Sequence, residues 1–123
     1  MDPIRALAEL KALAGVKRDA DVAVLHRLRA EIRALERQIQ MLDQASIDWL
    51  AGEGGPTAYQ MSGRDGLWNL WRVDRTREIR MRIAQLSADL ERQGQVARRS
   101  VGKHQVVEKL LERHGQAPKS RGY

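Results

Sequence analysis

The side chains best suited to metal or acid–base chemistry are three histidines, His26, His104 and His114, and the chain has no cysteine. His104 and His114 are ten residues apart, so a single helix would not direct both at one ion. His26 directly follows a leucine that belongs to a regular apolar pattern. We interpret the histidines as residues at the solvent edge of a helical interface, and we expect no metal site.

The sequence offers little else for catalysis. The run Gly102-Lys103-His104 lacks the preceding glycine of a phosphate-binding loop. The acidic residues lie in helical patterns, and a pair of helices offers no cleft in which the pKa of a carboxyl group would be shifted. We therefore expect a protein that is not an enzyme, has no catalytic residue and needs no cofactor.

The composition favours long helices. Ala, Leu, Arg, Glu and Gln dominate, whereas Phe is absent and only three Trp and two Tyr are present. Asp2 and Pro3 are suited to begin a helix, and the next strong breakers are the five glycines and one proline of residues 51–66. Gly115 and Pro118 supply a later stop. The sequence predicts one domain, with helix one at about 3–50, a Gly-rich connector at about 51–64, helix two at about 65–114 and a flexible tail at 115–123.

Apolar residues recur in alternating steps of three and four in both halves of the chain, which is the pattern of a coiled-coil seam. The connector is long enough to let the helices lie antiparallel, and a reversal near residue 58 makes the numbers of facing residues sum to about 118. We predict an all-α protein in which two long helices form an antiparallel coiled-coil hairpin. Its seam consists of Leu25, Leu28, Ile32, Leu35, Ile39, Leu42, Ile79, Ile83, Leu86, Leu90, Val107 and Leu111.

The pattern weakens toward the free ends of the predicted hairpin. In the first half it falters across residues 16–21, and the eleven residues from Ala14 to Leu25 match the spacing of a stutter, which locally unwinds a coiled coil. In the second half Ser100 and His104 occupy seam positions. The two weak stretches face each other in the antiparallel register. We therefore expect a firm middle and a looser seam toward the free ends.

The excess positive charge belongs to the second half. Residues 1–50 carry eight basic and eight acidic residues, whereas residues 67–123 carry thirteen basic and six acidic residues. The basic residues near the C-terminus form either a solvated face, partly neutralised by neighbouring acids, or a contact with an acidic protein surface or a nucleic acid. Nucleic acid ranks second, because few aromatics accompany these residues and no groove-reading motif is present.

A second surface feature is the run WNLWRVDRTREIRMR at 68–82, which combines two Trp with five Arg. Two accounts remain open. Trp49, Trp68 and Trp71 would close the connector end of the hairpin and shield its last layer. Alternatively, they form a docking surface, because Trp and Arg dominate the energetics of protein interfaces.

Residues 7–44, LAELKALAGVKRDADVAVLHRLRAEIRALERQIQMLDQ, resemble the FliJ family, a soluble component of the flagellar protein export apparatus. The features that carry the resemblance are the LxxLKxLA start, the small and charged stretch KRDADVAVL, and LERQIQML before the Gly-rich connector. The stretch VVEKLLERH at 106–114 is similar to the ending of many members. Together these segments span most of residues 4–114.

The resemblance implies a stalk-like cytoplasmic protein, monomeric on its own and peripherally associated with the export apparatus at the inner membrane, without inserting into it. It implies three partners: the hexameric export ATPase, whose assembly and activity the stalk promotes; the cytoplasmic linker of the export-gate membrane protein; and export chaperones. The implied ring-binding residues, at the end that carries both termini, are Arg5, Lys11, Lys17, Arg18, Arg98, Arg99, Lys103, Lys109 and Arg113. The implied gate-binding residues are Trp68, Trp71, Arg75, Glu78 and Arg82, although family members show a mainly apolar strip at this place.

Three other readings fit the same sequence. The first is the equivalent stalk protein of a virulence type III secretion system. The second is a basic coiled-coil protein that binds nucleic acid, which salt-dependent retention of a DNA duplex would favour. The third is a purely structural coil that oligomerises, whereas the hairpin predicts an elongated monomer.

Overall fold

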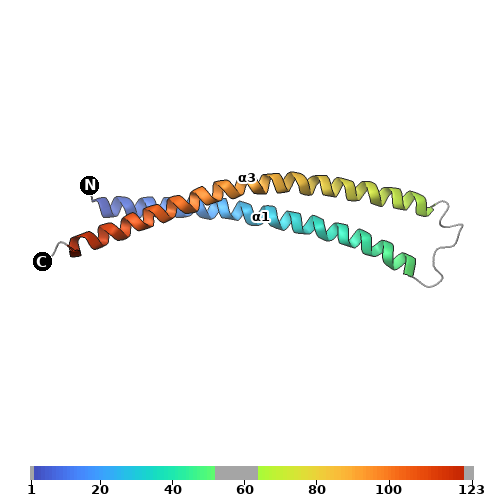
Figure 1. Cartoon of the computed structure of the whole chain (residues 1–123), viewed down its shortest axis with the longest axis horizontal. Coiled ribbons are helices and arrows are strands. Elements are labelled where there is room, and N and C mark those ends of the chain that lie inside the picture. The colour runs from blue at the N-terminus through green and yellow to red at the C-terminus, as the bar shows by residue number, and fades with distance from the viewer. Residues whose placement is uncertain (1, 52–63, 121–123) are drawn as a thin grey trace. The chain divides into compact units, whose positions relative to one another are not determined.

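The computed structural model describes residues 2–51 and 64–120, with side chains over 2–46 and 66–115. Two helices account for this part of the chain: α1, Pro3–Ala51, and α3, Arg64–Ser120 (Figure 1). No strand occurs among the described residues. The helices run in opposite directions and pack against each other, which confirms the predicted all-α helical hairpin. The predicted connector, apart from its end residues, lies outside the described part.

The start of α1 follows from its first two residues. The backbone N–H of Ile4 donates to Asp2 Oδ1 over 3.0 Å, and the N–H of Ala6 donates to the Asp2 carbonyl oxygen over 3.1 Å. Asp2 thereby satisfies amide groups that have no partner within the helix. Pro3, the first helical residue, has no N–H to satisfy.

The C-terminal end of α3 differs from the expectation. The helix continues through Gly115 and Pro118 to Ser120, where the sequence suggested an end at about residue 114 and a flexible tail. A glycine ends a helix when its φ is positive, and Gly115 does not adopt that conformation. In a helical conformation glycine costs only about 1 kcal/mol relative to alanine, so the helix passes through it.

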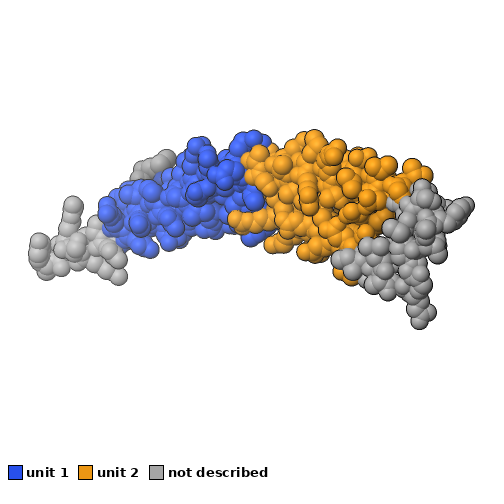
Figure 2. All heavy atoms as spheres, turned by 45° about the vertical axis from the view of Figure 1, so that its right-hand side comes forward, with its two compact units in different colours: residues 1–27, 90–123 blue, residues 28–89 orange. Residues whose placement is uncertain are grey.

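The chain divides into two compact units, each of which pairs a stretch of α1 with a stretch of α3 (Figure 2). Unit 1 combines residues 1–27 with 90–123, and unit 2 comprises residues 28–89. In unit 2 the most buried side chains are Ile79 and Leu86, each 2% exposed. The predicted seam residues that are half-buried in unit 2 are Leu28, Ile32, Leu35, Ile39, Leu42 and Ile83.

In unit 1 the seam is more polar. Ala97 and Val107 are buried, and Leu25, Leu90 and Leu111 are half-buried. Between them the buried positions of α3 are occupied by Ser100 and His104. The seam positions of Ser100 and His104 are thus buried in this unit, while the expected looseness of the seam toward the free ends stays a prediction.

The predicted stutter in α1 is wrong. Buried or half-buried residues continue from Ala14 through Arg18 and Asp21 to Leu25, in steps of four, three and four. The seam rhythm is thus unbroken across the eleven residues. Two polar side chains occupy seam positions there because α3 supplies polar partners for them, as described below.

Contacts between the helices set the register inside each unit. In unit 1 Lys11 Nζ lies 3.8 Å from Glu108 Oε2, so the paired numbers sum to 119. In unit 2 Arg72 Nη1 donates to Asp43 Oδ1 over 3.1 Å, and these numbers sum to 115. The two values lie on either side of the predicted 118. Neither α1 nor α3 contains an apolar stretch long enough to cross a membrane over the described residues.

Candidate functional site

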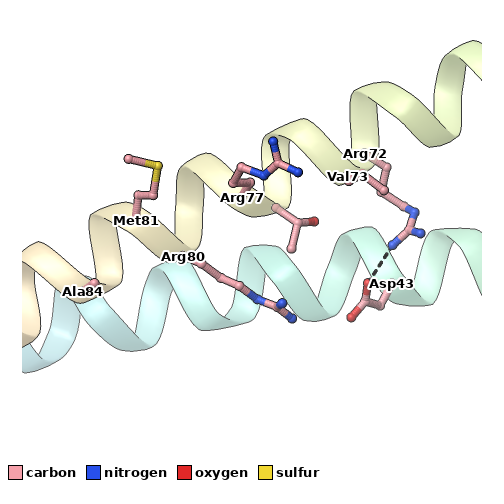
Figure 3. Close-up of a pocket in the computed structure, with 8 residues that line it drawn as sticks. Asp43, Arg72, Val73, Arg77, Arg80, Met81 and Ala84 are labelled. Atoms are coloured by element: carbon pink, nitrogen blue, oxygen red, sulfur yellow. Dashed lines mark hydrogen bonds and ion pairs between the residues drawn. The ribbon is translucent and has the colours of Figure 1, made fainter.

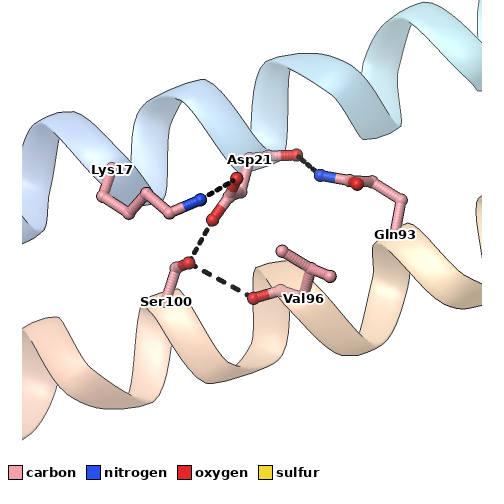
Figure 4. Close-up of polar contacts among 5 residues, drawn as sticks. All are labelled: Lys17, Asp21, Gln93, Val96 and Ser100. Carbon is pink, nitrogen blue, oxygen red and sulfur yellow. Dashed lines mark hydrogen bonds and ion pairs between the residues drawn. The ribbon is translucent and has the colours of Figure 1, made fainter.

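The most unusual feature of unit 1 is a buried carboxylate in the seam. Asp21 of α1 is 6% exposed and faces Ser100 of α3, which is equally buried. The Ser100 hydroxyl donates to Asp21 Oδ2 across the helix pair (Figure 4). Lys17 Nζ, one turn earlier on α1, donates to Asp21 Oδ1 over 2.9 Å. Both carboxylate oxygens therefore have a partner, which a buried charge requires.

These partners stabilise the charged form of the carboxyl group. The hydrogen bond from Ser100 is the largest influence lowering the pKa of Asp21 below its ordinary 3.8, and the hydrogen bond and positive charge of Lys17 act in the same direction. Burial acts the other way, because a charge is less stable away from water. The hydrogen bonds prevail, so Asp21 is ionised at neutral pH.

The same layer extends along α3. Gln93 Nε2 donates to the backbone carbonyl oxygen of Asp21 over 3.1 Å, so one residue of α1 is held by two residues of α3 (Figure 4). Ser100 Oγ also lies 3.2 Å from the Val96 carbonyl oxygen of its own helix. We call Lys17, Asp21, Gln93 and Ser100 the polar node. Directional hydrogen bonds replace apolar packing here, which fixes the register of unit 1.

His104 lies one turn beyond Ser100 and is 9% exposed. The interpretation of His104 as a residue at the solvent edge is therefore wrong, whereas His26 and His114 are exposed. Arg18 Nη1 lies 3.1 Å from His104 Nδ1. Because a guanidinium only donates, the ring nitrogen is the acceptor in this contact.

Glycine at position 15 makes room for the His104 ring. A β-carbon at Gly15 would lie 3.6 Å from His104 Cδ2, so the ring packs directly over the α1 backbone. Glu108 follows His104 by one helical turn, with its Oε2 3.9 Å from Nδ1. The same carboxylate approaches Lys11. The i, i+4 spacing of His104 and Glu108 is visible in the sequence and was the signal for this contact, which our sequence analysis missed.

Four glycines lie within the described helices of unit 1, at positions 15, 94, 102 and 115. Each weakens its helix by roughly 0.8–1 kcal/mol relative to alanine. Gly94 and Gly102 flank the α3 side of the polar node, and Gly15 lies two residues before Lys17 on α1. The seam of unit 1 is therefore held by polar contacts between helices that are themselves weakened.

An exposed stripe runs beside this seam. Each of its residues directly precedes a position of the seam rhythm, and in an antiparallel pair such residues of both helices lie along one edge. We call it the unit 1 stripe; it consists of Leu10, Leu13 and Lys17 of α1 with Arg99, Lys103, Val106, Leu110 and Arg113 of α3. Leu13 is 68% exposed and Val106 56% exposed. The stripe contains no acidic residue, so it combines apolar surface with positive charge.

The basic residues that the resemblance assigns to ring binding fall into two groups, those with a hydrogen-bond or ion-pair partner in the structure and those without one. Lys11 and Arg18 contact Glu108 and His104 of the other helix, and Lys17 donates to Asp21 of its own helix. Arg5 pairs with Glu9 on the surface, and Arg98 Nε donates to the Gly94 carbonyl oxygen. The remaining four are exposed and form no hydrogen bond or ion pair within the described residues: Arg99, Lys103, Lys109 and Arg113. Of these, Lys109 lies off the stripe.

The residues assigned to the export gate lie in unit 2. Trp68 is 40% exposed and Trp71 55% exposed, so neither is a core residue of the described part. Arg75 Nη1 donates to Glu78 Oε2 over 3.3 Å, and Arg82 is exposed. These residues also precede seam positions and form one edge of unit 2. The side chain of Trp49 lies outside the described residues, which leaves its predicted role at the connector untested.

Comparison of the chain with protein-family models, with characterised proteins and with solved structures gives no match. Within residues 2–51 and 64–120, no three His, Asp or Glu side chains gather in a way that would hold a metal ion. The candidate site consists of the unit 1 stripe and the polar node in the adjacent seam.

Proposed function

We propose that this protein is a non-enzymatic, stalk-like component of a flagellar type III export apparatus. In this proposal unit 1 binds the ring of the export ATPase and promotes its assembly and activity. The Trp68–Arg82 edge of unit 2 contacts the cytoplasmic linker of the export gate, and the stalk also binds export chaperones. The proposal rests on the resemblance of the helix motifs to the FliJ family and on the surface of unit 1.

The observation that carries the proposal is the unit 1 stripe. Leu13 and Val106 are exposed apolar side chains, which a protein without a binding partner would bury or replace with polar residues. Arg99 and Lys103 lie on the same stripe, and their charges have no partner within the described residues. An acidic surface with apolar residues at its centre would complement this stripe in both respects. The inner surface of a ring of subunits is a suitable partner, because a helix pair presents its edges to several subunits together.

The polar node gives unit 1 a way to adapt to such a ring. Polar contacts such as Asp21–Ser100 exchange with water more readily than packed apolar layers, and the helical glycines lower the cost of local distortion. A pair of helices held in this way keeps its register while its surface adjusts to successive subunits. Unit 2 differs in that its buried residues, Ile79 and Leu86, are both apolar.

Binding to the export ATPase of the same organism tests the proposal. We expect the full-length protein to co-elute with the ATPase in gel filtration and the Leu13→Asp/Val106→Asp variant to elute alone. Both positions are exposed, so the variant should keep its helicity by circular dichroism. An Arg29→Glu/Arg33→Glu variant, which alters exposed residues of unit 2, serves as the control and should still bind. Co-elution of the stripe variant would refute this assignment of the surface.

A further inference from the structure

A groove of about 550 Å³ lies in unit 2, on the edge of α3 opposite the Trp71 edge (Figure 3). Its lining residues on α3 include Val73, Arg77, Arg80 and Ala84, each of which directly follows a seam position. The groove thus runs along the helix pair with a heptad spacing of its own. This is the spacing that a third helix requires in order to pack beside the pair.

The charges of the groove are unbalanced. Figure 3 shows Arg72 extending from α3 to Asp43 of α1, which neutralises it at 3.1 Å. Asp43 is the only carboxylate among the described residues that line the groove. Arg77 and Arg80 form no hydrogen bond or ion pair within residues 2–51 and 64–120. Arg77 and Arg80 are three residues apart on one helix and their side chains point in different directions (Figure 3), so each guanidinium group is available to a separate anion.

Apolar side chains accompany these arginines. Val73 is 40% exposed and Met81 60% exposed, and both line the groove. A further unpaired group is the Thr76 hydroxyl in the groove wall, which is buried and has no hydrogen-bond partner among the described residues. Its oxygen has almost no accessible area, so the Thr76 hydroxyl lies behind the groove surface and offers no contact to a ligand there.

We infer that this groove binds an acidic amphipathic helix of a partner protein. Glutamate or aspartate side chains of that helix pair with the guanidinium groups of Arg77 and Arg80, and its apolar residues pack on Val73 and Met81. Guanidinium groups pair with carboxylates through two parallel hydrogen bonds, which suits both arginines. The apolar walls favour a peptide over a nucleic-acid backbone, which would present sugar and phosphate to them. The site lies on a different edge from the Trp68–Arg82 edge and is independent of the proposed ring contact.

The test uses the full-length protein and a synthetic helical peptide with leucine at its seam positions and glutamate beside them. The control peptide has glutamine in place of glutamate. We expect the glutamate peptide to bind, the glutamine peptide to bind at least about tenfold more weakly, and the Arg77→Gln/Arg80→Gln variant to lose about as much affinity. The Arg37→Gln/Arg82→Gln variant, which changes two exposed arginines that lie off the groove edge, should bind like the wild type. Isothermal titration and fluorescence anisotropy both measure these affinities.

A second variant examines the hydroxyl. Thr76→Val removes a group that has no partner within the described residues and preserves its shape, so neither the unfolding midpoint nor the peptide affinity should fall. Equal affinity of both peptides would overturn the proposal. So would tighter binding of a DNA duplex than of the glutamate peptide, lost in the Arg77→Gln/Arg80→Gln variant, because the groove would then be a phosphate site. Sedimentation of the protein as a dimer that this variant dissociates would instead assign the groove to a second copy of the chain.

Discussion

The Asp21 carboxylate of α1 accepts a hydrogen bond from the Ser100 hydroxyl of α3 in the buried seam of unit 1. A coiled coil gains most of its stability from apolar layers, so a charged residue at this position lowers stability relative to leucine. In return it fixes the register, because a displaced α3 would leave the carboxylate without its partner. The Asp21–Ser100 hydrogen bond thus determines which residues of α1 and α3 face each other in unit 1.

The first prediction concerns pH. The pKa of Asp21 is lowered in the folded protein, chiefly by Ser100, so the unfolded chain takes up the proton first as the pH falls. The stabilising contribution of Asp21 is fully present above its ordinary pKa of 3.8 and is lost as the pH falls through the lower folded value. Urea unfolding followed by circular dichroism should therefore show a difference between wild type and Asp21→Asn that shrinks below this pH. Parallel pH profiles would contradict the assignment.

The second prediction concerns the polar node as a whole. Replacing both partners, as in Asp21→Leu/Ser100→Ala, removes a buried charge together with its donor and should raise the unfolding midpoint. The single change Ser100→Ala should lower it, because Asp21 stays buried with one donor fewer. Thermal unfolding should therefore give the highest midpoint for the double variant, a lower one for the wild type and the lowest for Ser100→Ala. Any order in which Ser100→Ala is the most stable would show that the hydrogen bond contributes nothing.

The third prediction concerns the helical glycines. Gly102→Ala meets nothing within 4 Å, and the β-carbon of Gly15→Ala would lie in ordinary contact with His104. Each change should stabilise the protein by about 0.5–1 kcal/mol through helix propensity. Amide hydrogen exchange should slow in unit 1 and stay unchanged in unit 2. Loss of stability in Gly15→Ala alone would mean that the His104 ring requires the bare backbone.

The fourth prediction concerns the apolar layer of unit 2. Leu86 is 2% exposed, so Leu86→Ala should destabilise the protein by about 2–5 kcal/mol. The exposed Met81→Ala, on the same helix, is the matched control and should change stability by less than about 0.5 kcal/mol. Urea denaturation measures both. Similar losses in the two variants would place the core elsewhere.

The fold was accessible from the sequence because it depends on a short-range pattern. Steps of three and four between residues such as Leu28, Ile32 and Leu35 define which side of α1 is buried, and the breakers of residues 51–66 separate the two helices. The end of α3 was less accessible. A glycine followed by a proline favours a stop but does not enforce one, and the backbone conformation of Gly115 decides it.

The polar part of the seam was harder to predict for a different reason. A search for apolar residues passes over Arg18 and Asp21, although both keep the rhythm between Ala14 and Leu25. Whether a charged residue lies in a seam depends on a partner far along the chain, here Ser100 for Asp21. The groove beside Arg77 could not be predicted from the sequence either, because its charge depends on the ion pair between Arg72 of α3 and Asp43 of α1.

ATP hydrolysis by the export ATPase of the same organism tests the central claim most directly. We expect the wild-type protein to raise the hydrolysis rate while hydrolysing no ATP alone. Arg99→Glu/Lys103→Glu, which reverses two stripe charges without a partner in the described residues, should abolish the stimulation, and the matched Arg29→Glu/Arg33→Glu should retain it. Unchanged stimulation by the stripe variant would contradict the assignment of the surface. No stimulation by the wild type would contradict the proposed stalk function itself.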